Sequence, residues 1–453
     1  MPQLSSKMER TESRQGEAHA GNRRVETQSA MMGNVNSGKA LQMESVVERG
    51  NLLEALKRVK QNKGSPGVDG MKVEDMDANL RENWVGIREQ LLAGTYQPSP
   101  VKRVMIPKNG GGERELGIPT VIDRFIQQAL LQILQPIIDP TFSPHSYGFR
   151  PGRSAHQAVR SAKSYVGQGL RWVVDVDLEK FFDRVNHDVL MGRMEKRVQD
   201  KRILGLIRNY LEAGIMLHGV VTERNEGTPQ GGPLSPLLAN VLLDDVDKEL
   251  EKHGHKFARY ADDCNVYVAS ERAGKRVMGH LRKLYGKLKL RINESKSAVA
   301  RVTERKFLGF SMWYGAKGAV KLRVAHQAMD KMKEKVRQIT ERNGGRSVQT
   351  VVEELGRYLP GWRNYFGLAE TPGIFNELDE WIRHRLRQLH LKQWKRSKTI
   401  YRELLARRVP GWIARKIAAN SRRWWHNSCM SLNHALPIKY FDDLGLPRLS
   451  KVK

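Results

Sequence analysis

Two adjacent aspartates mark the place in this 453-residue chain where the residue types most clearly indicate chemistry. They belong to Tyr260-Ala261-Asp262-Asp263, which lies between two short apolar segments and is typical of a tight turn between two strands. Neighbouring carboxylates repel each other and lose hydration when buried, and a hard divalent cation relieves both costs. An Asx-type turn that carries two acids by accident is the alternative, so the tetrapeptide alone decides nothing.

Further carboxylates come from an earlier segment with the alternation of a β-strand. Residues 171–178 place Asp175 and Asp177 on the same strand face. The strand ends in Asp177, and if it lies beside the turn, the carboxylates of Asp177, Asp262 and Asp263 meet at one point. Such a group suits two Mg²⁺ ions about 3.5–4 Å apart, which activate an attacking hydroxyl and stabilise a leaving pyrophosphate.

Glycine-rich segments near these acids indicate phosphate binding. The segment 227–236 leads into an apolar helix, and helix N-termini with glycine-rich backbone favour phosphate. Lys108 and Arg114 flank a glycine-rich hairpin tip, from which they could neutralise a triphosphate. Residues 33–39 resemble a P-loop, but Ala40 stands where Ser or Thr must ligate magnesium and no apolar strand precedes them, so we reject that site.

The charge of the chain indicates a polyanionic partner. Lys and Arg number 78 against 49 Asp and Glu, a formal net charge of +29. We find no apolar run that could span a bilayer and no signal peptide, and the basic residues lie among aromatic and polar ones, which favours nucleic acid over a membrane surface. Cys264 and Cys429 offer no disulfide framework and no zinc pattern, so we expect a reducing cytoplasm.

The pattern of the chain predicts a mixture of helices and strands after a polar tail. We expect residues 1–43 to be disordered and order to begin near Glu44. Helical periodicity covers 44–59, 73–92, 123–138 and 201–213, begins again at Lys180, and dominates from His326 onward. The expected strands are 98–107, 115–118 and 171–178. Residues 381–453 contain 18 Lys and Arg against 3 acids.

The motifs together resemble a known family. The segments 116–120, Asp123-Arg124, 146–154, 177–183, 227–236, 260–263, 293–296 and 307–310 occur in the order of the reverse transcriptase blocks. From about Glu44 to the C-terminus, the chain resembles a bacterial group II intron-encoded protein, a reverse transcriptase that is also a maturase. Many relatives carry a C-terminal His-Asn-His endonuclease, and this sequence ends without one. In this respect it resembles the compact class C proteins, which implies that it does not cleave the second DNA strand.

The resemblance implies an α+β fold, the right-hand polymerase, in which fingers and a palm with an antiparallel sheet precede a helical thumb and a small basic helical domain. On this reading the disordered tail is 1–43, and the fingers with the N-terminal extension block are 44–170. The palm is 171–315, the thumb or maturase domain 316–396, and the DNA-binding region 397–453. We expect a bacterial, cytoplasmic protein.

The family pattern also implies roles for single residues at the reaction centre. Asp177, Asp262 and Asp263 correspond to the catalytic triad that binds two Mg²⁺ ions. Asp175 rivals Asp177 on physical grounds, but the pattern places the ligand five residues before an aromatic, here Phe182. Phe182 then excludes a 2′-hydroxyl and selects deoxynucleotides, with an ordinary core aromatic as the alternative.

Other residues are implied to contact the nucleotide or the nucleic acids. Gln230 corresponds to the nucleotide-pocket glutamine, and Lys108 with Arg114 to the fingertip pair that grips the triphosphate. Lys296 corresponds to a lysine near the departing pyrophosphate, unless it is only a solvated surface lysine. For single tryptophans, core packing is the alternative to base stacking. The residues implied to contact nucleic acid are Arg150, Arg153, Trp362, Arg363, Arg422 and Arg423.

The resulting hypothesis is an RNA-directed DNA polymerase that binds its intron RNA, assists splicing and copies the intron into target DNA during retrohoming. Its partners would be group II intron RNA, an RNA template with a DNA primer, target DNA and dNTPs. A splicing-only RNA-binding cofactor is one alternative, and the three intact aspartates argue against it. A free-standing reverse transcriptase of defence or repair is another, which the genomic context would separate from the first.

Overall fold

The computed structural model describes residues 41–107, 113–217, 220–222, 226–228, 231–430 and 432–450. These residues form two compact units, each assembled from segments that are separate in the sequence. The first unit contains the described residues up to Phe142, together with Lys180–Asp244 and Leu288–Leu290. The second contains Ser143–Glu179, Asp245–Lys287 and the described residues from Arg291 onward.

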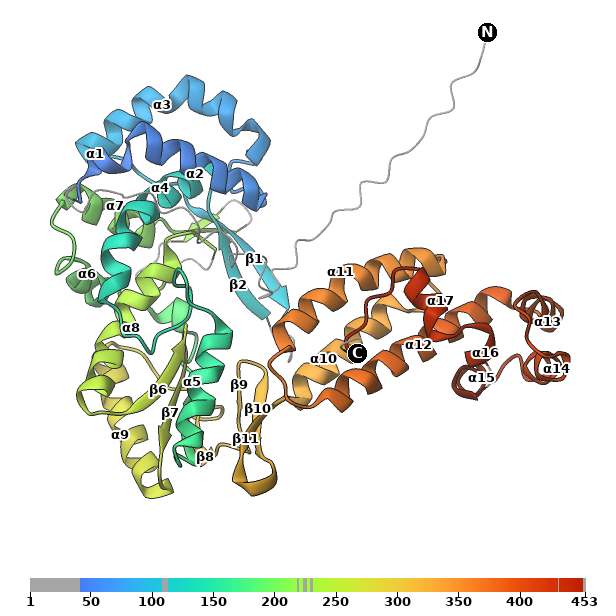
Figure 1. The fold of residues 1–453 in the computed structure, drawn as a ribbon. Coiled ribbons are helices and arrows are strands. Elements are labelled where there is room, and N and C mark those ends of the chain that lie inside the picture. The colour runs from blue at the N-terminus through green and yellow to red at the C-terminus, as the bar shows by residue number, and fades with distance from the viewer. Residues whose placement is uncertain are drawn as a thin grey trace, which may run out of the picture. The chain divides into compact units, whose positions relative to one another are not determined.

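The first unit begins with helices that pack on α4 (Figure 1). Asn51 of α2 donates through Nδ2 to the carbonyl of Ala129 at 3.0 Å, and Gln132 donates to the Asn51 side chain at 2.7 Å. The Thr120 hydroxyl caps α4, since it accepts from the N–H of Asp123 at 3.1 Å. The helices are α1 (Met43–Val46), α2 (Arg49–Asn62), α3 (Met76–Ala93) and α4 (Val121–Ile138).

A small sheet and further helices complete the first unit. Among the described residues, its strands follow the order β2-β1-β4-β5, with β1 and β2 antiparallel and β1 and β4 parallel. The strands are β1 (Val101–Pro107), β2 (Glu113–Ile118), β4 (Ile215–Leu217) and β5 (Val220–Thr222). The later helical elements are η3 (Phe181–Arg184), α6 (His187–Met194), α7 (Lys201–Glu212) and most of α8 (Ser235–Lys252).

The second unit is built on an antiparallel sheet of order β6-β7-β3-β8 in the described part of the chain. Helix α9 packs so closely on it that a Cβ added to Gly274 would lie 2.4 Å from Cγ1 of Val299. Val173 and Tyr267 share a buried cluster with Tyr165 of α5. The elements are α5 (Ala155–Gly167), β3 (Trp172–Val176), β6 (Lys256–Tyr260), β7 (Asp263–Val268), α9 (Glu271–Lys287) and β8 (Ala298–Arg301).

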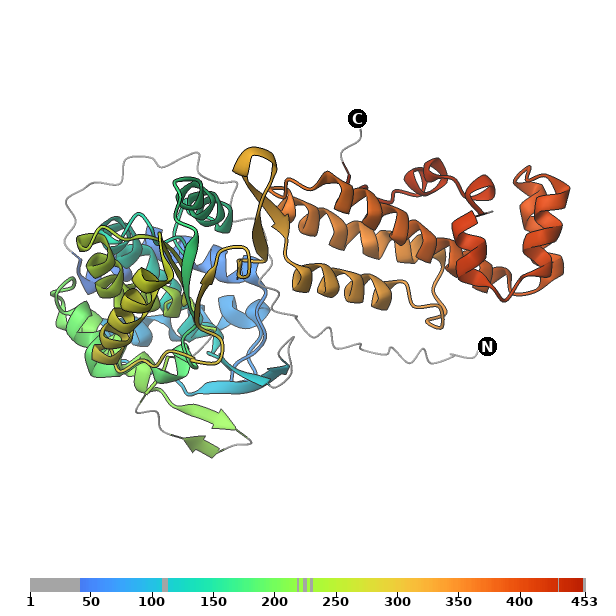
Figure 2. The same ribbon diagram turned by 90° about the horizontal axis from the view of Figure 1, so that it is seen from below.

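A second antiparallel sheet leads into a helical region that runs to the end of the described chain. Figure 2 shows α10, α11 and α12 side by side, with shorter helices beyond them. The strands of this sheet are β9 (Lys306–Phe307), β10 (Phe310–Tyr314) and β11 (Val320–Val324). The helices are α10 (His326–Ile339), α11 (Val348–Phe366), α12 (Pro372–Trp394), α13 (Ser397–Ala406), α14 (Gly411–Ala419), α15 (Trp424–Met430), α16 (Leu432–Ala435) and α17 (Ile438–Asp443).

The mixture of helices and strands agrees with the predicted α+β class, and two local predictions need correction. The helix predicted to begin at Lys180 is wrong: Lys180 has φ +46, and only a 3₁₀ turn follows before α6. The helix predicted over 44–59 is divided into α1 and α2, and order includes Met43, which is buried. The predicted tail, up to residue 40, lies outside the described residues.

A search of the described residues finds no helix with the length and apolarity needed to cross a membrane.

Candidate active site

Asp177 lies one residue beyond the end of β3. In the pairing of β3 with β7, Val176 is opposite Cys264, so the next positions at this end of the sheet are Asp177 and Asp263. The backbone of Asp177 is held on both sides. Its N–H donates to the Ser297 hydroxyl at 3.0 Å, and its carbonyl accepts from the N–H of Asn293 at 2.8 Å. The register therefore places this carboxylate next to the β6–β7 turn.

Asp262 lies at the tip of the turn between β6 and β7, where Tyr260 pairs with Asp263. Ala261 has φ +58, a left-handed conformation that is uncommon for a residue with a Cβ. A Cβ added to Gly148 would lie 2.2 Å from the backbone nitrogen of Ala261. The segment before α5 thus packs directly against the turn, and only glycine permits that approach at position 148.

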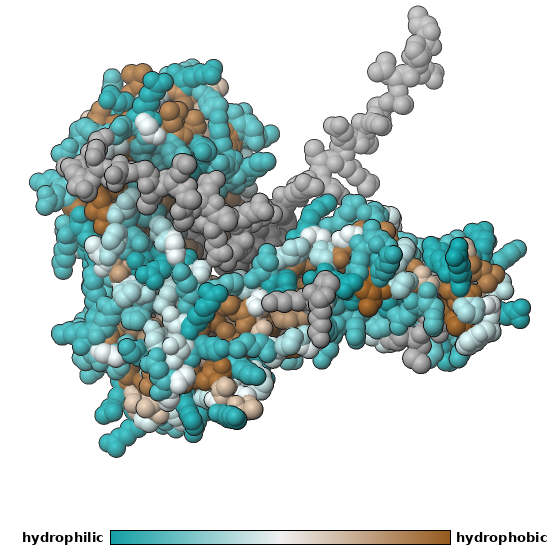
Figure 3. Space-filling view, in the orientation of Figure 1, coloured by the Kyte–Doolittle hydropathy of each residue, from teal (hydrophilic) through white to brown (hydrophobic). Residues whose placement is uncertain are grey.

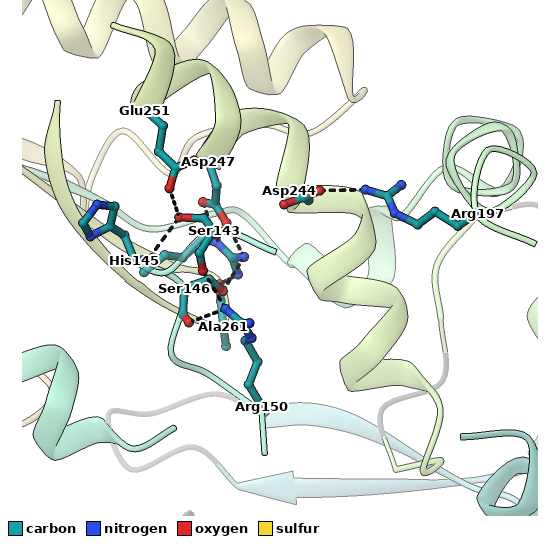
Figure 4. Close-up of polar contacts among 10 residues, drawn as sticks. Ser143, His145, Ser146, Arg150, Arg197, Asp244, Asp247, Glu251 and Ala261 are labelled. Carbon is teal, nitrogen blue, oxygen red and sulfur yellow. Dashed lines mark hydrogen bonds and ion pairs between the residues drawn. The ribbon is translucent and has the colours of Figure 1, made fainter. Parts of the chain in front are cut away.

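A buried guanidinium holds the same turn from inside, and its partners Ser146, Asp247 and Ala261 lie together in Figure 4. Arg259 of β6 is fully buried and forms an ion pair with Asp247 at 2.5 Å. It also donates to the Ala261 carbonyl at 2.9 Å and to the Ser146 hydroxyl at 2.8 Å. Because one side chain bonds the end of α8, the segment at Ser146 and the turn, it fixes the position from which Asp262 and Asp263 project.

The carboxylates of the turn lie in an environment short of positive charge. Loss of hydration raises the pKa of Asp262, and the charge of Asp177 raises it further. Loss of hydration also raises the pKa of Asp263, to about 7, with added repulsion from Asp262 and Asp177. Asp263 is still exposed as a residue, so its carboxylate remains open to a ligand.

Asp175, the rival of Asp177, is engaged by an arginine. The Arg305 guanidinium contacts one carboxylate oxygen of Asp175 through Nη2 at 2.6 Å and Nε at 2.8 Å. Burial still raises the pKa of Asp175, and Arg305 opposes that effect. Since a guanidinium already compensates this carboxylate, the geometry favours Asp177 as the partner of the turn.

The donor set suits a hard divalent cation. Asp177, Asp262 and Asp263 offer only oxygen atoms, which Mg²⁺ prefers, and the raised pKa values of the turn show that a positive charge would stabilise the ionised site. Lys296 supplies part of that charge, because its Nζ lies 3.6 Å from Oδ2 of Asp177. Its side chain is 66% exposed, so it can move to another anion.

Two family models match this chain. One, described as reverse transcriptase (RNA-dependent DNA polymerase), matches residues 106–312, and one described as group II intron, maturase-specific domain, matches residues 329–409. Protein YkfC of Escherichia coli (strain K12) is 34% identical over 294 residues, which cover 56% of this chain and 77% of YkfC. This chain belongs to the group II intron-encoded reverse transcriptases and maturases.

Other comparisons cover less of the partner protein. The group II intron-encoded protein LtrA of Lactococcus lactis subsp. cremoris is 36% identical over 241 residues, which cover 52% of this chain and 40% of LtrA. A chain of a partial Cas6-RT-Cas1–Cas2 complex is 27% identical with a TM-score of 0.36, and the match covers 57% of this chain and 44% of that one. The reverse transcriptase domain makes this protein an RNA-directed DNA polymerase of a typically metal-dependent family.

The residues predicted to contact the nucleotide are only partly described. Lys108 and Gln230 lie outside the described residues. Arg114 occupies β2 opposite Ile106. Phe182 lies in η3, half-buried, with its ring 5.1 Å from that of Phe181 in an edge-on arrangement. Phe182 belongs to the first unit and the aspartates to the second, so its role in the nucleotide pocket stays a prediction.

Two of the predicted nucleic-acid contacts have buried side chains in this structure, and their contact with nucleic acid stays a prediction. Arg150 is buried, and its guanidinium donates inward to the carbonyls of Ser143 and Ser146 at 2.6 and 2.9 Å. Trp362 is only 9% exposed and packs on Phe366, 4.8 Å between ring centroids. Trp362 has the period of the buried face of α11, which favours core packing for this residue.

The other four predicted contacts keep accessible surface. Arg153, Arg422 and Arg423 are exposed. Arg363 is partly buried, with its guanidinium carbon 4.4 Å from the centroid of the Phe375 ring. Their contacts with nucleic acid stay predictions.

Sequence reasoning missed the residues that hold the site in place. Arg259 directly precedes the Tyr260 motif, and a cation inside an apolar strand was the signal that could have found it. Arg305 and Tyr365 gave no local signal. Tyr365 of α11 donates to the Leu308 carbonyl at 3.0 Å, and burial raises its pKa to about 12, with further contributions from Tyr260 and Asp263. Helix α11 therefore reaches the neighbourhood of the turn.

Proposed function

We propose that this reverse transcriptase synthesises DNA on an RNA template at a single centre formed by Asp177, Asp262 and Asp263 with two Mg²⁺ ions. The observation that carries the proposal is the register of β3 and β7, which brings Asp177 to the turn that bears the other two acids. When bound, two Mg²⁺ ions activate the primer hydroxyl and stabilise the leaving pyrophosphate. The protein contributes three fixed carboxylates and, at Lys296, a mobile cation for the phosphates.

The remaining nucleotide contacts belong to the same proposal. Lys108 and Arg114 would grip the triphosphate, Gln230 would line the nucleotide pocket, and Phe182 would exclude a 2′-hydroxyl. Primer extension on an RNA template by the purified chain tests this account. We expect extension with dNTPs and Mg²⁺, and little with rNTPs or with EDTA. Equal use of rNTPs would contradict the role of Phe182, and extension without a divalent cation would contradict the metal site.

We also propose that α10, the segment directly after it, α12 and α15 form a site for an unpaired nucleotide of the intron RNA. A pocket of about 410 Å³ lies among these helices. Hydrophilic side chains are prominent over this helical part of the chain, with apolar patches between them (Figure 3). The lining residues are Arg337, Glu341, Arg342, Asn343, Arg385, Lys392 and Trp424.

The charges of this pocket favour an anion beside an aromatic ring. The Arg342 guanidinium carbon lies 4.7 Å from the Trp424 ring centroid, and Nζ of Lys392 lies 5.2 Å from it. Burial lowers the pKa of Arg385, and the charges of Arg342 and Arg337 lower it further. A phosphate would relieve this repulsion, while Trp424 could stack on a base.

The double variant Arg342→Ala/Lys392→Ala tests the pocket through RNA binding measured over a range of salt. We expect weaker binding and a log–log salt slope that is shallower by about 1.4–1.8, since each phosphate contact contributes about 0.7–0.9. Lys275→Ala is the matched control, because Lys275 is an exposed cation on α9 paired with Glu271 at 2.6 Å. An unchanged slope in the double variant would contradict the pocket.

The last described helices support a third part of the proposal. Arg422 and Arg423 are exposed in a region with an excess of basic residues, which suits contact with the phosphates of target DNA during retrohoming. Loss of binding to target DNA, with retained binding to intron RNA, is the expected result for Arg422→Ala/Arg423→Ala in a gel-shift assay. Equal loss of both would argue against a separate DNA contact.

A further inference from the structure

Three potential metal ligands meet at the end of α8, on residues that the polymerase centre does not use. Glu249 lies in the last turn of α8, His253 follows directly after the end of that helix, and His280 comes from α9. Each offers one ligand atom, and the three atoms lie within 4.8 Å of one another. All three residues belong to the second unit. Residues at positions i and i+4 of one helix with a third from a neighbouring helix can enclose one ion.

The hydrogen bond of His253 leaves a nitrogen suited to a metal. Its Nδ1 lies 2.8 Å from the backbone carbonyl of Glu249 and 3.5 Å from Oε1 of the Glu249 carboxylate. A carbonyl oxygen can only accept, so Nδ1 carries the proton and Nε2 of the neutral ring keeps its lone pair. Metal-binding histidines usually donate their second nitrogen to a carbonyl or a carboxylate in this way.

His280 presents a second nitrogen that needs a partner. Its Nε2 is buried and has no hydrogen-bond partner among the described residues. Its ring lies 5.2 Å from that of His253. A buried polar atom without a partner is costly, and a bound ion would supply the missing interaction. Lys252, the cation 3.9 Å from Glu249, is 75% exposed and can move into solvent.

A third histidine ring lies beside the cluster. The His255 ring stacks on that of His253 with 6.2 Å between centroids and an interplanar angle of 17°.

We propose that Glu249, His253 and His280 bind a Zn²⁺ ion that joins α8 to α9. Two imidazoles and a carboxylate suit zinc, whereas the aspartates of the polymerase centre offer oxygen alone, so the two sites select different metals. Water or His255 would complete the coordination. Because α9 packs on β3 and β7, the strands that bear the catalytic aspartates, the ion would stabilise the support of the active site.

Zinc binding by the full-length protein tests the proposal. The protein is stripped with EDTA, equilibrated with Zn²⁺ in excess Mg²⁺, passed through a desalting column and analysed for zinc per chain. We expect one ion per chain in the wild type. His253→Gln and His280→Ala should each weaken zinc affinity by more than about 100-fold, since loss of an outer-shell partner alone costs about 10–100-fold. His253 is exposed, so its substitution leaves folding unaffected.

Two controls distinguish this site from others. His326 and Asp330 also form a histidine–carboxylate pair at i and i+4, 2.8 Å apart on α10, and His326→Gln should keep one zinc per chain. Asp262→Asn should also keep it, although it removes a proposed Mg²⁺ ligand. Absence of zinc from the wild type, or equal zinc in the wild type and both cluster variants, would overturn the proposal. Loss of zinc in Asp262→Asn would assign the ion to the aspartates instead.

Discussion

Asp175 lies on β3 and Asp177 one residue beyond its end, and the two side chains have different surroundings. Arg305 contacts Asp175, whereas Asp177 lies at the strand end beside the turn. We expect Asp177→Asn to lower the rate of primer extension by about 10³-fold or more, because loss of a metal ligand removes several kcal/mol of transition-state stabilisation. Asp175→Asn should lower it by less than about 10-fold. A larger effect at Asp175 would reverse the assignment.

Gly148 gives a second test at the scale of one residue. A Cβ at this position would meet the backbone of Ala261, which cannot move without displacing Asp262. Gly148→Ala should therefore reduce primer extension strongly while RNA binding persists. Gly167→Ala is the control, since a Cβ there meets nothing within 4 Å. Normal activity in the Gly148 variant would show that the turn tolerates displacement.

The sequence made some residues of the site predictable and hid others. Asp177, Asp262 and Asp263 stand out because a strand pattern and a turn pattern place them, and the order of motifs connects the two. Arg305 lies 130 residues after Asp175, and no local pattern relates them. The burial of Arg150 and Trp362 was not predictable, because a basic or aromatic residue type does not reveal whether its side chain points inward.

The β6–β7 hairpin is positioned by the buried pair of Arg259 and Asp247. Arg259→Met should lower the free energy of unfolding by about 3–5 kcal/mol, because it leaves a buried carboxylate without its guanidinium. The double variant Arg259→Met/Asp247→Leu should recover most of this stability in denaturant unfolding. It should not recover primer extension, since the Ala261 carbonyl still lacks its donor. Recovery of activity with stability would contradict a positioning role.

The packing of α12 against α17 predicts that the stability of this region depends on pH. Burial lowers the pKa of His390 to about 4, and the charge of Arg407 contributes. Its ring nitrogen lies 3.2 Å from the Tyr440 hydroxyl. The unfolded histidine, with its ordinary pKa of 6.5, binds a proton first, so stability is present above pH 6.5 and is lost as the pH falls towards 4. The free energy of unfolding should fall by about 3 kcal/mol over this range of pH.

Hydrogen exchange of the α12 and α17 amides measures this effect. Protection, corrected for the intrinsic exchange rate, should fall between pH 6.5 and about 4 in the wild type and change little in His390→Gln. Equal pH dependence in both proteins would assign the effect to another group.

Helices with a strong apolar periodicity were predicted well. Turns that depend on the backbone angles of a single residue were not. The periodic helix from Val121 to Ile138 was expected within two residues of its observed start. The segment after Asp177 has helical composition, but Lys180 adopts a left-handed conformation and the chain turns there. Such an angle depends on contacts between distant segments, which the local sequence does not contain.

At the scale of the whole molecule, one chain with a formal net charge of +29 carries a polymerase domain and a maturase domain. The acids of the proposed polymerase centre lie at strand ends and in a turn, whereas the basic pocket is lined by α10, the segment after it, α12 and α15. Amino-acid substitutions should therefore be able to remove DNA synthesis without removing RNA binding, and the reverse. This separation is also what distinguishes a reverse transcriptase with maturase function from a splicing-only cofactor.

The most direct test measures primer extension and intron RNA binding on the same preparations of wild type and Asp262→Asn. We predict that extension falls by about 10³-fold or more, while RNA affinity stays within about threefold, because the substitution removes one metal ligand and no basic side chain. Circular dichroism confirms that the variant is folded. Substantial extension by folded Asp262→Asn, or an equal loss of extension and RNA binding, would contradict the assignment of the three aspartates as the polymerase centre.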